Sequence, residues 1–300
     1  VGLGALTTDT LGSHTVAIGR GALETQNFTT ATDSNNTAVG TFAGRAVTTG
    51  INNTLIGATS GDAITTGQQN TAVGRATLGA TTTANNNTAM GYYALTSNTT
   101  AADNTAFGAS ALGANTTGSS NTAVGKGAGL SVTTGVENTL IGGLAGDAQN
   151  TASYNTLIGS VAGSALTTGG ENTAVGRASL FAGTTGTQNV AVGVESLSGN
   201  TTGQYNVAVG YKALDANTTA SNNTAVGKGA MLLNTTGDYN TAIGLTSLSA
   251  NTTGRFNTAS GADALLRNTT GNSNTATGYA SLEDNTTAAN NSAYGNNSLA

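Results

Sequence analysis

Short apolar segments recur along this chain at a constant interval, and each of them ends in glycine. The segment has the form Asn-Thr-Ala-Val-Gly, and between the copies that end at Gly40 and Gly295 every step is 17 residues. Two earlier copies end at Gly2 and Gly19, and the longer step from Gly19 to Gly40 contains four extra residues. Self-similarity at a fixed period is typical of solenoids, in which each repeat packs only on its neighbours. We therefore predict one continuous array of about eighteen 17-residue rungs over residues 1–300, with a four-residue insertion in an irregular rung at 20–36.

Each segment from asparagine to glycine is predicted to form a short β-strand, because Thr and Val favour strands while Gly, Asn and Ser favour turns. Neighbouring strand residues point to opposite faces, so Ala38 and Val39 and their equivalents must face different sides. The first position is Ala or Leu throughout, and the second is apolar except at Ser260, Thr277 and Tyr294. We expect one face to line the interior and the other to pack on a second chain, which predicts an oligomeric fibre.

The asparagine that opens the segment is present in all sixteen regular copies. Identical residues at a constant spacing stack when rungs lie about 4.8 Å apart, so their amides can form a hydrogen-bonded ladder. A Thr-Thr pair eight and nine residues after each glycine, as in Thr99-Thr100, is interrupted only in the Asn150-Thr151 rung and is expected to stack in the same way. The predicted structural ladder consists of Asn36, Asn53, Asn70, Asn87, Asn104, Asn121, Asn138, Asn155, Asn172, Asn189, Asn206, Asn223, Asn240, Asn257, Asn274 and Asn291.

Leucine changes position between rungs in a compensating way. Four residues after the motif glycine, eleven of the sixteen regular rungs have Leu or Met and five have Gly. Leu55, Leu140 and Leu157, which replace the strand alanine, all belong to rungs with Gly at that position. A close-packed interior requires such conservation of volume, so we expect leucine to fill one shared layer from either position. The five glycines are Gly44, Gly61, Gly129, Gly146 and Gly163.

The repeated segment, together with Thr15-Val16-Ala17-Ile18-Gly19, resembles the head repeats of YadA-type trimeric autotransporter adhesins and similar repeats of phage and viral tail fibres. The resemblance covers essentially all 300 residues. It implies an all-β fold, a parallel β-solenoid of the left-handed β-roll type, in which three chains pack side by side as a homotrimeric fibre.

Composition and charge restrict the function classes. The chain has no Cys, Pro or Trp, only 8% charged residues and a net charge of −5, so it lacks both thiolate metal ligands and the basic patches that bind nucleic acid. No apolar run is long enough to span a membrane. Because the sequence begins at Val1-Gly2 and stops within a motif at Leu299-Ala300, we expect it to be part of a longer fibre protein, with anchor and cap domains elsewhere.

Groups that could carry catalysis are scarce. The only histidine is His14, in the irregular opening rung, and Asp62, Asp147, Glu137 and Glu171 occupy variable turn positions. They form no repeated pair, so we interpret them as solvated surface residues. Gly125-Lys126-Gly127 lacks the hydroxyl residue and the helix of a phosphate-binding loop. We expect no catalytic residue, no cofactor and no metal, and hence no enzyme.

Two repeated features leave alternatives open. Asn98-Thr99-Thr100 and similar triplets satisfy the N-glycosylation pattern, and they are interpreted either as glycan acceptors along one edge or as an unmodified turn ladder. Tyr154, Tyr205 and Phe256 lie 51 residues apart, just before the asparagine column, which indicates either duplication of three-rung units or spaced ligand contacts. The other triplets begin at Asn115, Asn200, Asn217, Asn234, Asn251, Asn268 and Asn285.

The function that this pattern predicts is a structural shaft of an extracellular fibre or filament, such as an adhesin head or stalk or a tail fibre, which mediates attachment or spacing. Its expected location is extracellular, at a cell surface or on a virion appendage. Its expected partners are copies of itself and a host-surface glycan or protein. The alternative is a repetitive ligand-binding surface, for glycan or ice, formed by the Asn and Thr ladders.

Overall fold

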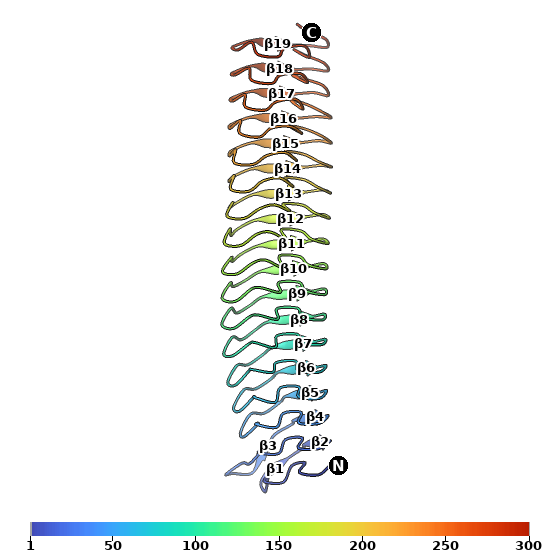
Figure 1. Ribbon diagram of the computed structural model, residues 1–300, viewed down its shortest axis with the longest axis vertical. Helices are drawn as coiled ribbons and strands as arrows, with labels where there is room; N and C mark the ends of the chain where they lie inside the picture. Colours follow the sequence, from blue (N-terminus) through green and yellow to red (C-terminus); the bar gives the residue numbers. More distant parts are fainter. Residues whose placement is uncertain (1, 300) are drawn as a thin grey trace. The chain divides into compact units, whose positions relative to one another are not determined.

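The computed structural model describes residues 2–299 and divides them into two compact units, Val1–Ser153 and Tyr154–Ala300. Each unit is an all-β parallel solenoid, and the described residues contain no helix. The prediction of a parallel β-solenoid is thereby confirmed, with about 17 turns in the two units together. Figure 1 shows how the strands of each unit stack one above another.

The first unit contains a parallel ladder of eight strands and a separate pair. In the ladder each strand pairs with the next one in sequence order. The separate pair joins β1, which precedes the insertion rung, to β3 within it. The pair is β1 (Gly12–Ser13) and β3 (Thr32–Asp33), and the ladder is β2 (Val16–Ile18), β4 (Thr37–Val39), β5 (Thr54–Ile56), β6 (Thr71–Val73), β7 (Thr88–Met90), β8 (Thr105–Phe107), β9 (Thr122–Val124) and β10 (Thr139–Ile141).

The second unit contains nine strands in one parallel ladder, again in sequence order. The register aligns equivalent residues, so Thr224 lies opposite Thr241 and Ala225 opposite Ala242. The strands are β11 (Thr156–Ile158), β12 (Thr173–Val175), β13 (Val190–Val192), β14 (Val207–Val209), β15 (Thr224–Val226), β16 (Thr241–Ile243), β17 (Thr258–Ser260), β18 (Thr275–Thr277) and β19 (Ser292–Tyr294).

The middle residue of each motif strand points into the solenoid. Ala38, Leu55 and Ala225 have no exposed surface, whereas the flanking strand residues are half-buried or exposed. The prediction that adjacent strand residues face opposite sides is therefore confirmed. The outward position, which we call the outer strand column, carries Val39, Ile56 and their equivalents.

The glycine that ends each strand is required by both conformation and space. Gly57 has a φ of 134°, and a Cβ atom placed on it would lie 2.4 Å from the carbonyl oxygen of Gly74. Any side chain at this position would therefore push the next rung away. The same two constraints apply at Gly91, whose Cβ would lie 2.6 Å from the Gly108 carbonyl carbon.

The turns use left-handed residues that are not glycine. In the rung that follows Gly91, Tyr93, Leu95 and Asp103 have φ values of 59°, 49° and 62°. A left-handed conformation costs an ordinary residue roughly 1–2 kcal/mol. The turn chemistry predicted from Gly, Asn and Ser alone is thus incomplete, because Leu95 also adopts this conformation and offsets its cost by complete burial.

The predicted exchange of leucine between two positions has a direct geometric basis. The Leu55 side chain occupies the space beside two glycines: Cβ atoms on Gly44 and Gly61 would lie 2.6 and 2.8 Å from its methyl carbons. Leu140 and Leu157 lie in the same way against Gly129 and Gly163, at 2.6 and 2.7 Å. A strand leucine and a leucine four residues after the motif glycine therefore compete for one volume.

This competition predicts a coupled mutational response. Gly61→Leu should destabilise the chain strongly because it clashes with Leu55, and Leu55→Ala should cost about 2–5 kcal/mol because it opens a cavity. Gly61→Leu should cost less in the Leu55→Ala background than in the parent chain. Thermal unfolding of the four variants by circular dichroism measures the coupling, and strictly additive effects would contradict the shared volume.

Candidate functional site

The sixteen asparagines predicted to form a ladder lie just before the motif strands, and all but the last are buried. Within each unit, the Oδ1 atom of one asparagine accepts a hydrogen bond from the backbone N–H of the next: Asn70 N–H donates to Asn53 Oδ1 at 3.0 Å. The Nδ2 atom of Asn53 donates to the Gly67 carbonyl oxygen at 2.9 Å. Each side chain thus binds the next rung through its oxygen and a facing turn through its nitrogen. We call this column the first asparagine ladder.

A second asparagine column runs through the interior on the other side of the Thr-Thr turn. Asn217 Nδ2 donates to Asn200 Oδ1 at 2.7 Å and to the Ala220 carbonyl oxygen at 3.0 Å. The pattern continues in the second unit through Asn285. We call this column the second asparagine ladder.

The second ladder decides between the two interpretations of the Asn-Thr-Thr triplets. Asn98, Asn115 and Asn200 have no exposed surface, as is also the case at Asn217, Asn234, Asn251 and Asn268. A glycan on any of these Nδ2 atoms would have to displace the neighbouring rung. The folded solenoid therefore accommodates these seven triplets only as an unmodified ladder, and the interpretation as a line of glycans along one edge is wrong for them.

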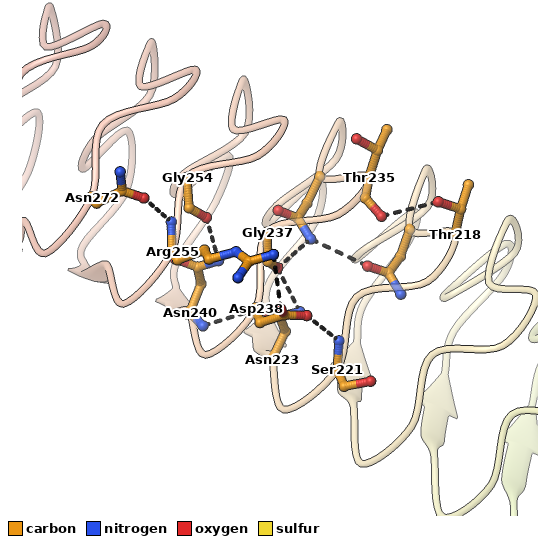
Figure 2. A network of polar contacts seen from close by, with 12 residues as sticks. Thr218, Ser221, Asn223, Thr235, Gly237, Asp238, Asn240, Gly254, Arg255 and Asn272 are labelled. Atoms are coloured by element: carbon orange, nitrogen blue, oxygen red, sulfur yellow. Dashed lines mark hydrogen bonds and ion pairs between the residues drawn. The ribbon is translucent and has the colours of Figure 1, made fainter.

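The Thr-Thr pair presents two different environments. The first threonine is half-buried and bonds to the next rung, as Thr218 Oγ1 does in donating to the Thr235 carbonyl oxygen at 3.1 Å (Figure 2). The second threonine, for example Thr219, is exposed. The second member of the pair is therefore the more accessible to a ligand.

A further polar column lies two residues before the first asparagine ladder. The backbone N–H of Ser221 donates to Asp238 Oδ1 at 2.8 Å, and that of Arg255 donates to Asn272 Oδ1 at 2.7 Å (Figure 2). Asp238 also pairs with Arg255 at 3.4 Å. This column was not predicted from the sequence, although recurrent Asn, Ser and Asp at one position of the repeat was a usable signal.

The ionisable residues are dispersed and bound to their surroundings. His14 Nδ1 lies 3.1 Å from Asp33 Oδ1 on the exposed opening rung, and Glu171 accepts a hydrogen bond from Gln188 at 2.7 Å. Asp62 and Glu137 lie on separate rungs, and Asp147 also has an interaction partner. Within residues 2–299 no group of three or more His, Asp or Glu residues is placed to hold a metal ion.

Carboxylate pKa values shift in both directions. A hydrogen bond from Ser13 and the charge of His14 lower the pKa of Asp33, and hydrogen bonds from Arg177 and Lys212 lower that of Glu195. Partial burial raises the pKa of Asp62 and Asp215, despite nearby Arg45 and Lys212.

Comparisons with protein-family models, with curated proteins and with solved structures found no match to this chain. Among the described residues, none belongs to a helix that could cross a membrane.

The buried ladder predicts a strong and pH-dependent response to Asn206→Asp. The carboxylate would face two oxygens, Asn189 Oδ1 and the Ala220 carbonyl, to which Asn206 Nδ2 now donates. We expect the free energy of unfolding to fall by about 3–5 kcal/mol at neutral pH, since an unpaired buried charge is costly. The loss should shrink as the pH falls, because the protonated carboxyl can donate again.

Asn222→Asp is the matched control, since Asn222 is the exposed residue just before the first asparagine ladder. Its urea midpoint should stay close to that of the parent chain. Equal effects of the two substitutions would show that the ladder contributes nothing specific.

The scarcity of titratable groups in the interior predicts a nearly constant melting temperature between about pH 7 and pH 9. The lowered pKa values of Asp33 and Glu195 contribute stability that is lost as the pH falls through their folded values. The raised pKa values of Asp62 and Asp215 act in the opposite direction, because protonation removes an unfavourable charge from the fold. Thermal unfolding at several pH values measures this profile, and a steep change near neutrality would contradict it.

Proposed function

We propose that this chain is a structural shaft segment of an extracellular fibre, and that it is not an enzyme. The observation that carries the proposal is the repetition of one bonding scheme from rung to rung in each unit. The interior polar side chains bind the adjacent rung, so they are used to extend the solenoid. Such bonding between neighbouring rungs is typical of an extended repeat protein with a structural role.

The proposed shaft is a side-by-side homotrimer. The outer strand column supports this proposal because most of its residues are apolar and remain solvent-accessible on the single chain. Ile56, Phe107 and Val124 belong to it in the first unit, and Ile243 in the second, all more than one-third exposed. Contiguous apolar surface of this kind is typical of association sites. The resemblance to adhesin-head and tail-fibre repeats supports three chains, a left-handed roll and a cell-surface or virion location.

The alternative function is a ligand surface built from the Asn and Thr ladders. Burial reduces the number of ladder residues that could contact such a ligand. Both asparagine ladders lie inside the solenoid, so they can support a surface without contacting a ligand. The exposed second threonine of each pair and the exposed aromatic side chains remain as contact groups.

The assembly proposal predicts rods in negative-stain images and a solution mass about three times the 29.1 kDa of one chain. The variant Val124→Thr/Ile141→Thr should lower that mass toward one chain, because it interrupts the apolar surface of the outer strand column on two consecutive rungs. Its far-ultraviolet circular dichroism should be retained, since Thr277 occupies the equivalent position naturally. Analytical ultracentrifugation measures both species.

Compact globules, or a parent chain that sediments as a monomer at all concentrations, would overturn the assembly proposal. Thr219→Ser is a suitable control variant, because it alters an exposed turn threonine and leaves the outer strand column intact.

A further inference from the structure

Aromatic side chains gather in one surface column of the second unit. Tyr205, Tyr239 and Phe256 all occupy the position just before the first asparagine ladder, and they are 53%, 54% and 58% exposed. In the first unit the same column contains Asn52, Gln69 and other residues without aromatic rings. The aromatic column is therefore a local addition to the rung, which folds without it.

The backbone fixes the direction in which these side chains leave the solenoid. Tyr205, Tyr239 and Phe256 have φ values of 57°, 59° and 58°, and the asparagines that follow them belong to the first asparagine ladder. Tyr239 and Phe256, on consecutive rungs, stack with their ring centroids 5.2 Å apart and their planes 9° from parallel. Rings in this column can therefore lie face to face at the spacing of the rungs.

The column holds no aromatic ring between Tyr205 and Tyr239. The two tyrosines are two rungs apart, which corresponds to about 9–10 Å, and the rung between them carries the short residue Asn222. A flat ring placed above Asn222 would lie about 5 Å from each tyrosine, within the range of about 4.5–7 Å for stacked ring pairs. We call this place the tyrosine slot.

The groups around the tyrosine slot are suited to hydroxyl-bearing ligands. The exposed amide of Asn222 offers a donor and an acceptor at its base, and Gln204 lies beside Tyr205 on the adjacent position. Asp238 next to Tyr239 is held by Ser221 N–H and by Arg255, so its charge is already paired. The surroundings are thus polar and close to neutral, which disfavours strongly anionic ligands on a chain with a net charge of −5.

We propose that the tyrosine slot binds a sugar ring of a neutral polysaccharide. The apolar C–H faces of the sugar stack on Tyr205 and Tyr239, and its hydroxyl groups bond to Asn222 and Gln204. Aromatic walls with a few polar groups are typical of small-molecule sites. This site uses a different column from the outer strand column, so it does not depend on the proposed trimer.

The test is a binding titration of the full chain with the uncharged oligosaccharides cellohexaose and chitohexaose, with heparin as the anionic comparison. The chain has no tryptophan and eight tyrosines, so the difference in tyrosine fluorescence between the parent chain and the double variant reports the slot, and isothermal titration calorimetry gives the affinity and stoichiometry. The parent chain should bind at least one uncharged oligosaccharide in preference to heparin. Tyr205→Asn/Tyr239→Asn should weaken that binding at least tenfold.

Matched variants separate the slot from general effects. Asparagine already occupies this column at Asn52 with a φ of 60°, so the double variant should keep the solenoid fold and lose only the Tyr239–Phe256 ring stack, which circular dichroism and thermal unfolding check. Tyr279→Asn, which removes an exposed tyrosine from another column, should bind like the parent chain. Gln69→Tyr/Asp103→Tyr, with Asn86 between them and Gln68 before the first, should create a second slot and double the stoichiometry.

Three results would overturn the proposal. The first is a parent chain that fails to bind either oligosaccharide at millimolar concentration. The second is a double variant that binds as tightly as the parent. The third is a double variant that sediments as a smaller species while neither protein binds sugar, which would assign the column to contact between copies. Disruption of the trimer by Val124→Thr/Ile141→Thr with sugar binding retained would separate the two proposals.

Discussion

The hydrogen bond between a buried asparagine and the next rung is the constraint on which the rest of this structure depends. Asn70 N–H reaches Asn53 Oδ1 only if both residues occupy the same place in consecutive rungs, and Asn53 Nδ2 reaches Gly67 only if the turn between them keeps its length. A buried amide without partners costs about 1–3 kcal/mol. A change in rung length would therefore break bonds in two rungs at once, which explains why the 17-residue period is kept. The insertion at 20–36 lies in the opening region, where Gln26 replaces a ladder asparagine and bonds to Asn36.

Regular bonding is combined with strained turns. Each rung accepts several left-handed residues, and Leu95 shows how the strain is offset: the conformation directs a fully buried leucine into the interior that the next rung covers. Gly61 has a similar φ of 57°, but there the same volume is filled by Leu55 from the strand. The backbone conformation is thus the same in both rungs, but the leucine that fills the interior comes from the turn in one and from the strand in the other. The rung tolerates sequence variation wherever volume and hydrogen bonding are preserved.

The sequence alone predicted the features that depend on period and alternation. The strands, the opposite orientation of Ala38 and Val39 and the compensation between Leu55 and Gly61 all follow from spacing and from close packing. Which of the two strand positions faces inward came from the structure, because both are mostly apolar. The buried second asparagine ladder was left open, because Asn98-Thr99-Thr100 has the same composition whether it lies at a surface turn or inside. The left-handed Leu95 was missed because leucine is not a usual turn residue. Its conformation is imposed by burial between neighbouring rungs, which is a tertiary effect that local propensity does not contain.

Interior residues hold the rungs together while surface residues can vary, and this separation explains how a repetitive chain can carry a local function. Interior columns are more stable when the same polar residue is repeated on every rung. Val132 follows Asn115 in the second asparagine column, and because valine has no donor, Asn115 Oδ1 is buried without a hydrogen-bond partner. The surface column before the first asparagine ladder has no such cost, because its backbone bonds are the same for Asn52 as for Tyr205. Aromatic residues can accumulate there without loss of the ladders. A shaft built on this plan can therefore acquire binding sites one rung at a time, with the spacing between them fixed by the solenoid.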